Sequence, residues 1–222
     1  DLTFFRPVFV KIFPKLQEKY IDKQRFYESP NGKLLPSVTT VLSGLSKAGI
    51  DDWKRRVGET MADEISKNSM ANGTEMHSVI ESFLRNKTKT SDNETSQKLF
   101  EQMKPELLKI NNIMAQEIQL YSEKLGVAGR VDCIAEYNGI PSVIDFKSSS
   151  KKKQKSWITS YFLQATAYSL MWEELTHKKI DQVVIIISAN DGTVTTYVEN
   201  KDQFVEQLLG IIDDWQCRRD FG

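Results

Sequence analysis

The stretch GRVDCIAEYNGIPSVIDFK, residues 129–147, has the pattern of a β-hairpin. Runs rich in Val, Ile, Tyr and Phe flank Asn138-Gly139, a pair that readily adopts the positive φ angles of a tight two-residue turn. Such a turn fixes the strand register, and counting outward from it places Asp132 opposite Asp145. We therefore expect two carboxylates about 5 Å apart at Cβ on one face of the sheet.

Facing carboxylates repel each other, and a divalent cation held by both is the simplest chemistry that removes the repulsion. The same register places Arg130 opposite Lys147, so that a basic side chain stands two residues from Asp145 on the same face. Pro141 donates no ladder hydrogen bond, and it predicts a bulge or an edge position that would shift the register. The hairpin by itself indicates a cation site and no particular reaction.

Composition limits the possible classes of protein. The chain has 222 residues, 40% of them hydrophobic, which is enough for one sizeable core. No apolar run approaches the ~18 residues of a membrane span, so we expect no membrane partner. Thirty basic and thirty acidic residues cancel, so attraction to a nucleic acid has to come from local patches. Two cysteines without metal-type spacing exclude an iron–sulfur cluster.

Periodicity predicts one domain of mixed α/β class over 1–222. It would consist of an N-terminal arm with helices at about 1–85, a core at about 99–200 and a C-terminal helix at about 201–220. Within it we expect a helix capped by Asp51-Asp52 and carrying Trp53, Val57, Met61 and Ile65, and a second helix starting at 72–74. The other expected elements are a polar loop at 86–97, a helix at 99–108 interrupted near Pro105, strands at 110–121, 181–188 and 193–198, a helix at 157–175, and a last helix capped by Asn200.

Several polar side chains outside the hairpin are candidates for a site. His77 and Glu81 lie four residues apart on one helical face, as a core histidine with its partner or as metal ligands. Gln164 and Tyr168 have the same spacing. Two basic clusters, 54–56 and 151–155, are typical of solvated surfaces, but the second directly follows the hairpin and precedes Trp157, which favours contact with nucleic acid.

Taken in order, these features resemble the RecB-type branch of the PD-(D/E)XK nuclease superfamily. That branch carries a Gly-Thr-x-x-His-x-x-x-Glu helix, a Gly-x-x-Asp strand, an Asp/Glu-x-Lys strand and a Gln-x-x-x-Tyr helix in this sequence order. The matching positions are Gly73 to Glu81, Gly129 to Asp132, Asp145 to Lys147, and Gln164 to Tyr168. Val131 replaces a proline common in the family, and Asp145 replaces glutamate. Four motifs in series rarely arise by chance.

The resemblance implies a restriction-endonuclease-like core, with a small mixed sheet flanked by helices, and a metal-dependent single-stranded DNA exonuclease. It implies that one or two Mg²⁺ or Mn²⁺ ions are bound by His77, Asp132, Asp145 and the carbonyl of Phe146, and that Asp132, Asp145 and Lys147 are catalytic. Glu81, Glu117, Gln164 and Tyr168 would support them. The expected DNA contacts are Lys151, Lys152, Lys153, Lys155, Trp157 and Arg55.

The family resemblance further implies a monomer that works in mitochondria with the replication machinery, on flaps and linear single strands of DNA. Two alternatives remain open from the sequence. One is a nucleic-acid-binding module on an inactive nuclease fold, against which the intact Asp132, Asp145 and Lys147 argue. The other is an endonuclease acting on duplex DNA.

Overall fold

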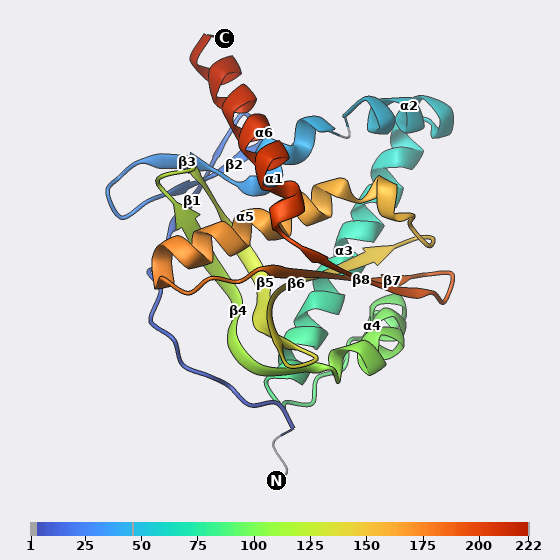
Figure 1. The fold of residues 1–222 in the computed structure, drawn as a ribbon. Helices are drawn as coiled ribbons and strands as arrows, with labels where there is room; N and C mark the ends of the chain where they lie inside the picture. Colours follow the sequence, from blue (N-terminus) through green and yellow to red (C-terminus); the bar gives the residue numbers. More distant parts are fainter. Residues whose placement is uncertain (1–3, 46, 222) are drawn as a thin grey trace.

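The computed structural model, which describes residues 4–45 and 47–221, is built on a mixed five-stranded sheet of order β4-β5-β6-β7-β8 (Figure 1). Neighbouring strands are antiparallel except β6 and β7, which are parallel because helix α5 crosses over between them. The predicted mixed α/β class is confirmed. The strands are β4 (Ile110–Ser122), β5 (Val127–Tyr137), β6 (Ile140–Ser149), β7 (Gln182–Ala189) and β8 (Val194–Asn200).

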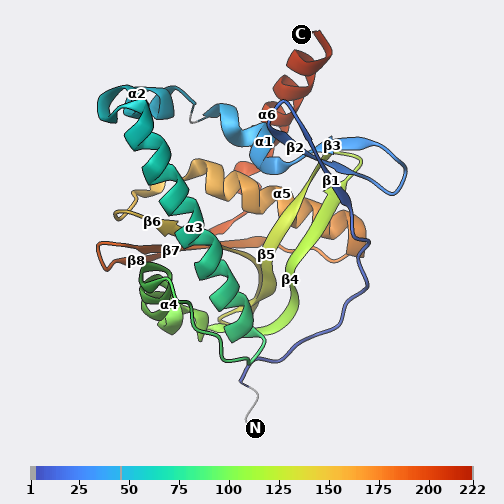
Figure 2. The same cartoon turned by 180° about the vertical axis from the view of Figure 1, so that it is seen from behind.

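Helices cover both faces of this sheet (Figures 1 and 2). Helices α3 (Glu59–Leu84) and α4 (Glu94–Leu107) pack on one face, and α5 (Thr159–Thr176), α6 (Asp202–Phe221) and α1 (Val38–Leu42) pack on the other. Strand β7 supplies both cores, because Ile185 faces α5 while Val184 and Ile186 face α3 and α4. This explains why 183–187 is a continuous apolar run.

A smaller sheet lies beside the first half of β5. Strands β1 (Gln17–Ile21), β2 (Gln24–Glu28) and β3 (Leu34–Pro36) form an antiparallel sheet whose Tyr27 and Leu35 pack against Ala128. The remaining elements are α2 (Lys47–Val57) and two short 3-10 turns, η1 (Ser43–Leu45) and η2 (Lys155–Trp157). None of the helices in the described ranges is long and apolar enough to cross a membrane.

The predicted hairpin register is confirmed near the turn and ends earlier than expected. Asn138 and Gly139 have φ angles of +49° and +80°, and the ladder runs from Tyr137–Ile140 to Cys133–Ile144. Pro141 pairs within the ladder and does not shift it.

The facing pairs Asp132–Asp145 and Arg130–Lys147 are wrong as ladder pairs, because β5 and β6 part after Cys133 and Ile144. Beyond that point Asp145 pairs with β7, and Arg130 pairs with Gln119 of β4.

Two helix starts predicted from the sequence are wrong. Helix α2 begins at Lys47, before Asp51-Asp52, and Gly58 with φ +87° separates it from α3, which carries Met61. The start predicted at 72–74 lies inside α3, which runs unbroken from Glu59. The Asn72 carboxamide and carbonyl oxygens accept hydrogen bonds from Asn93 and Ser96 around α4, so this polar triplet joins two helices instead of beginning one.

Helix α4 also differs from its prediction. It starts at Glu94, where the Asn93 side chain accepts a hydrogen bond from the Ser96 N–H as an N-cap, so the polar loop is shorter than 86–97. Pro105 does not interrupt it. This proline stands in the last turn, so the only partner lost inside the helix is the carbonyl of Glu101, which is exposed.

Candidate active site

The candidate site lies where β5 leaves β6. Here the N–H of Phe146 donates a hydrogen bond to Oδ2 of Asp132 over 2.9 Å, so the carboxylate occupies the gap between the parting strands. On the other side of β5, the pairs Gln116–Cys133 and Ile118–Val131 set Glu117 across from Asp132. Glu117 has φ +49°, a left-handed conformation that a non-glycine residue rarely adopts and that is common at functional sites.

Helix α3 adds a histidine to these two carboxylates. Nδ1 of His77 lies 3.6 Å from Oε1 of Glu117 and 3.5 Å from Oδ1 of Asp132. One ligand atom from each of the three residues lies within 4.8 Å of the others. Burial lowers the pKa of His77, but the carboxylates of Asp132 and Glu117 outweigh burial and raise the pKa to about 9. The position therefore attracts positive charge.

Lys147 and Asp145 form a buried ion pair beside this cluster. The Lys147 ammonium lies 2.9 Å from Oδ2 of Asp145 and donates a hydrogen bond to Oε1 of Gln164 over 2.9 Å. Burial lowers the pKa of Lys147, but the carboxylates of Asp145 and Asp132 reverse the effect and raise it above its usual value. Burial raises the pKa of Asp145, and the Lys147 ammonium offsets only part of this rise.

The Gln-x-x-x-Tyr motif on α5 holds this lysine in place. Nε2 of Gln164 donates a hydrogen bond to the hydroxyl of Tyr168 over 3.2 Å, while its Oε1 accepts from Lys147. The Tyr168 ring packs on Gly129, where a Cβ atom would lie 2.7 Å from Cε1. Similarly, a Cβ at Gly73 would lie 3.2 Å from Oγ of Ser148. Both motif glycines thus permit close approach of neighbouring elements.

The residues fit a divalent cation. Imidazole and carboxylate ligands suit Mn²⁺ as well as Mg²⁺, and three such donors converge in His77, Glu117 and Asp132. Close by, the buried carboxylate of Asp145 faces the Lys147 ammonium through Oδ2, and a carboxylate has enough lone pairs to bind a metal as well. Two partly buried carboxylates as close as those of Glu117 and Asp132 are costly unless a cation compensates their charge.

The cluster differs from the predicted ligand set. Glu117, expected only in a supporting role, belongs to it. Glu81 does not, because its carboxylate pairs over 2.9 Å with Arg85, the residue that caps the C-terminal end of the same helix. Asp145 is directed to Lys147, and Phe146 contributes its N–H to Asp132. Since Glu117 is brought to His77 by pairing between β4 and β5, only its position on an alternating strand could have signalled it in the sequence.

The basic candidates occupy separate positions. In the run after β6, Lys151 and Lys152 are exposed, Lys153 is half-buried, and Lys155 pairs with Glu199 of β8. Trp157 in η2 is 66% exposed, a large apolar area for a surface side chain. Arg55 on α2 is also exposed and pairs with Asp52 over 2.9 Å.

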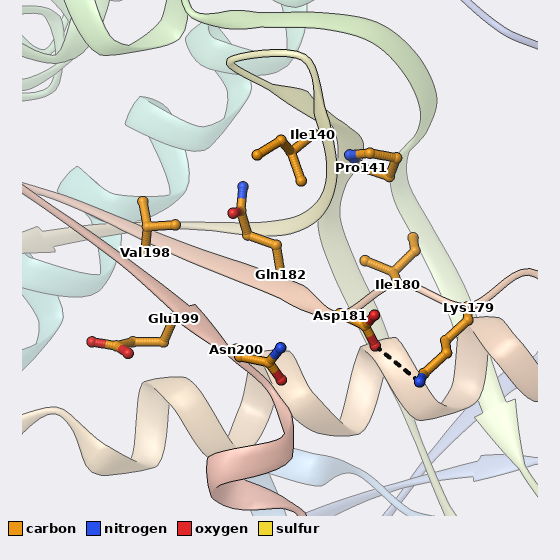
Figure 3. Close-up of a pocket in the computed structure, with 9 residues that line it drawn as sticks. All are labelled: Ile140, Pro141, Lys179, Ile180, Asp181, Gln182, Val198, Glu199 and Asn200. Atoms are coloured by element: carbon orange, nitrogen blue, oxygen red, sulfur yellow. Dashed lines mark ion pairs between the residues drawn. The ribbon is translucent and has the colours of Figure 1, made fainter.

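A hollow elsewhere on the molecule is unrelated to this chemistry (Figure 3). It lies at the starts of β6 and β7, where Ile140 and Gln182 line it together with Asn200 at the end of β8. Since Lys147 stands near the opposite end of β6, this hollow and the carboxylate cluster lie at different ends of the sheet. In Figure 3 the Lys179–Asp181 ion pair stands at its edge.

Comparison with known families identifies the class of protein as a nuclease. The model of the PD-(D/E)XK nuclease superfamily matches residues 101–218, more than half of the chain. The chain therefore belongs to this superfamily, and the matched residues include β4 to β8 and α5.

Two curated relatives carry the name mitochondrial genome maintenance exonuclease 1. The human protein is 29% identical over 176 residues, which cover 72% of this chain and 51% of that protein. The mouse protein is 30% identical over 129 residues, covering 54% and 38%. The chain thus spans about half of the human protein's length and less of the mouse protein's. A solved structure from Eubacterium rectale, 13% identical, covers 68% of this chain and 65% of its own with a TM-score of 0.47.

Proposed function

We propose that this protein is a metal-dependent DNA exonuclease that hydrolyses phosphodiester bonds from free ends of single-stranded DNA. The observation that carries the proposal is the convergence of His77, Glu117 and Asp132 next to the Lys147–Asp145 ion pair in a member of a nuclease superfamily. Three ligands of this type together with a buried ammonium serve the chemistry of phosphoryl transfer to water.

The residues divide the work of hydrolysis between them. His77, Glu117, Asp132 and Asp145 would hold Mg²⁺ or Mn²⁺, which when bound polarises a phosphate oxygen and activates water. The Lys147 ammonium, fixed by Asp145 and Gln164, offsets negative charge that grows on the phosphate during attack. Because this cation is positioned before substrate arrives, little reorganisation is needed in the transition state.

The substrate is inferred from the surface next to the site. Lys151, Lys152, Lys153 and Lys155 follow β6, and Trp157 exposes a ring on which a base could stack, a combination suited to single strands. Arg55 on α2 would contact the DNA backbone at a position away from this lysine run. From the names of the two relatives we further propose a mitochondrial location and a role in genome maintenance. The family resemblance adds the processing of DNA flaps and linear single strands beside the replication machinery, and action as a monomer.

The experiment uses end-labelled linear and circular single-stranded DNA with Mn²⁺, with Mg²⁺ and with EDTA. We expect metal-dependent shortening of the linear strand, intact circles, and at least about 10²-fold slower cleavage for Asp145→Asn and Lys147→Met. The first removes a charged metal ligand and the partner of Lys147, and the second removes the ammonium that offsets charge in the transition state. Lys178→Met, an exposed change beyond the far end of α5, is the control. Cut circles would instead indicate an endonuclease, and binding without cleavage in any metal would indicate an inactive binding module.

A further inference from the structure

Tyr161 stands in the first turn of α5 with two ammonium groups around its ring. Nζ of Lys147 lies 4.8 Å from the ring centroid, and Nζ of Lys153 lies 5.4 Å from it. Lys153 also donates a hydrogen bond to the Tyr161 hydroxyl over 3.0 Å. An aromatic ring attracts cations most strongly where water is partly excluded, so Tyr161 contacts both the proposed catalytic lysine and a second one.

Within the 151–155 run, the Lys153 ammonium contacts Tyr161, the ring that also contacts Lys147. The Lys152 main-chain N–H donates to Asp191 over 2.9 Å, and the Lys155 ammonium pairs with Glu199. The carbonyl of Lys153 accepts a hydrogen bond from the Tyr197 hydroxyl over 2.9 Å, which anchors its backbone. The Lys153 side chain therefore extends to Tyr161 from an anchored main chain.

The charge of Lys153 is not neutralised locally. Lys147 has the Asp145 carboxylate 2.9 Å away, whereas within the described part of the chain no carboxylate stands at ion-pair distance from the Lys153 ammonium. A half-buried cation without a counter-ion, held next to a phosphate-cleaving centre, is an anion site. The anion that a nuclease brings there is a phosphodiester of its substrate.

We propose that Lys153 binds a phosphate of the DNA next to the one that is cleaved, and that Tyr161 is the positioning residue that holds Lys153 and Lys147 together. The inference rests on the proposed nuclease function. It assigns one lysine of the run to one phosphate, where a solvated basic patch would contact many phosphates weakly and interchangeably.

The test combines protein variants with single-stranded DNA in which one phosphate at a time is a neutral methylphosphonate. For the wild-type protein, neutralising the phosphate beside the cleaved one should raise KM about 3- to 10-fold, in the range expected for the net contribution of one hydrogen bond in water. Lys153→Met should raise KM similarly on ordinary DNA with kcat changed less than twofold. The KM of Lys153→Met should then not rise further with the methylphosphonate strand.

Tyr161 is tested by two substitutions of different severity. Tyr161→Phe keeps the ring and loses only the hydroxyl, so it should raise KM as Lys153→Met does while keeping kcat. Tyr161→Leu removes the ring from both lysines and should lower kcat about 10-fold or more, in keeping with a misplaced catalytic group. Lys178→Met again controls for the loss of one positive charge, and thermal unfolding confirms that each variant is folded.

An equal methylphosphonate penalty in the wild type and in Lys153→Met would overturn the inference, as would unchanged kinetics in Tyr161→Leu. A wild-type protein that fails to cleave any strand in any metal would overturn the proposed function itself. These outcomes are distinct, because the first two require an active enzyme.

Discussion

At the scale of single residues, Gly129 shows how an absent side chain shapes the site. A Cβ atom there would lie 2.7 Å from Cε1 and 3.1 Å from the hydroxyl of Tyr168. Gly129→Ala must therefore displace the ring whose hydroxyl holds Gln164. We expect the free energy of unfolding to fall by about 1–3 kcal/mol, as for other overpacked positions, and cleavage to slow. Urea denaturation measures the first effect.

The matched control is Gly210→Ala. Gly210 lies inside α6, and a Cβ there would meet no atom within 4 Å beyond its chain neighbours and the backbone of its own helix. Alanine in a helix interior should stabilise the protein by about 0.5–1 kcal/mol relative to glycine. Equal stability of the two variants would show that Tyr168 does not pack on Gly129 in solution.

At the scale of elements, Glu106 ties α4 to the sheet. Its Oε2 accepts hydrogen bonds from the hydroxyls of Tyr137 on β5 over 2.8 Å and Thr196 on β8 over 3.0 Å. Burial raises the pKa of Glu106, but hydrogen bonds from Lys109, Tyr137 and Thr196 outweigh burial and hold the pKa below its usual 4.5. A carboxyl group with a lowered folded-state pKa stabilises the protein above its unfolded-state pKa and loses that contribution on acidification.

Glu106→Gln should therefore lower the free energy of unfolding by about 1–3 kcal/mol at pH 7, where wild-type Glu106 is a charged acceptor. The difference should shrink as the pH falls through the folded-state pKa, below 4.5, because a protonated glutamic acid resembles glutamine. Chemical denaturation of both proteins between pH 3 and pH 7, at intervals of about one unit, follows this linkage. A difference that stays constant with pH would contradict the assigned role of the charge.

Some features of these elements were predictable from the sequence and others were not. The hairpin register followed from Asn138-Gly139, because a two-residue turn is local chemistry. The parting of β5 and β6 after Cys133 was not predictable from the turn, since beyond it the Phe146 N–H is bonded to the Asp132 side chain, a contact that no turn or periodicity signals. The polar triplet at 72–74 suggested a helix start because its contact with α4 is likewise tertiary.

At the scale of the whole molecule, His77, Glu117 and Asp132 come from α3, β4 and β5, so the site joins a helix to the sheet. Of these, His77 and Asp132 were predicted as ligands from spacing and resemblance, and Glu117 gained its place from strand pairing. A cation bound here can exist only when the three elements are assembled. Metal affinity should therefore appear as stability of the entire fold.

Adding Mn²⁺ to EDTA-treated protein should raise its unfolding temperature. At a free Mn²⁺ concentration of about 100 times the dissociation constant, binding adds about 2.7 kcal/mol to the free energy of unfolding. In a domain of this size that corresponds to a rise of roughly 5–10 °C, which scanning calorimetry without DNA resolves. Glu117→Gln removes one charged ligand and should abolish most of the rise, whereas Glu81→Gln should keep it because Glu81 pairs with Arg85. If Glu81→Gln abolished the rise and Glu117→Gln kept it, the ion would lie on the helical His77–Glu81 face instead of between α3 and the sheet.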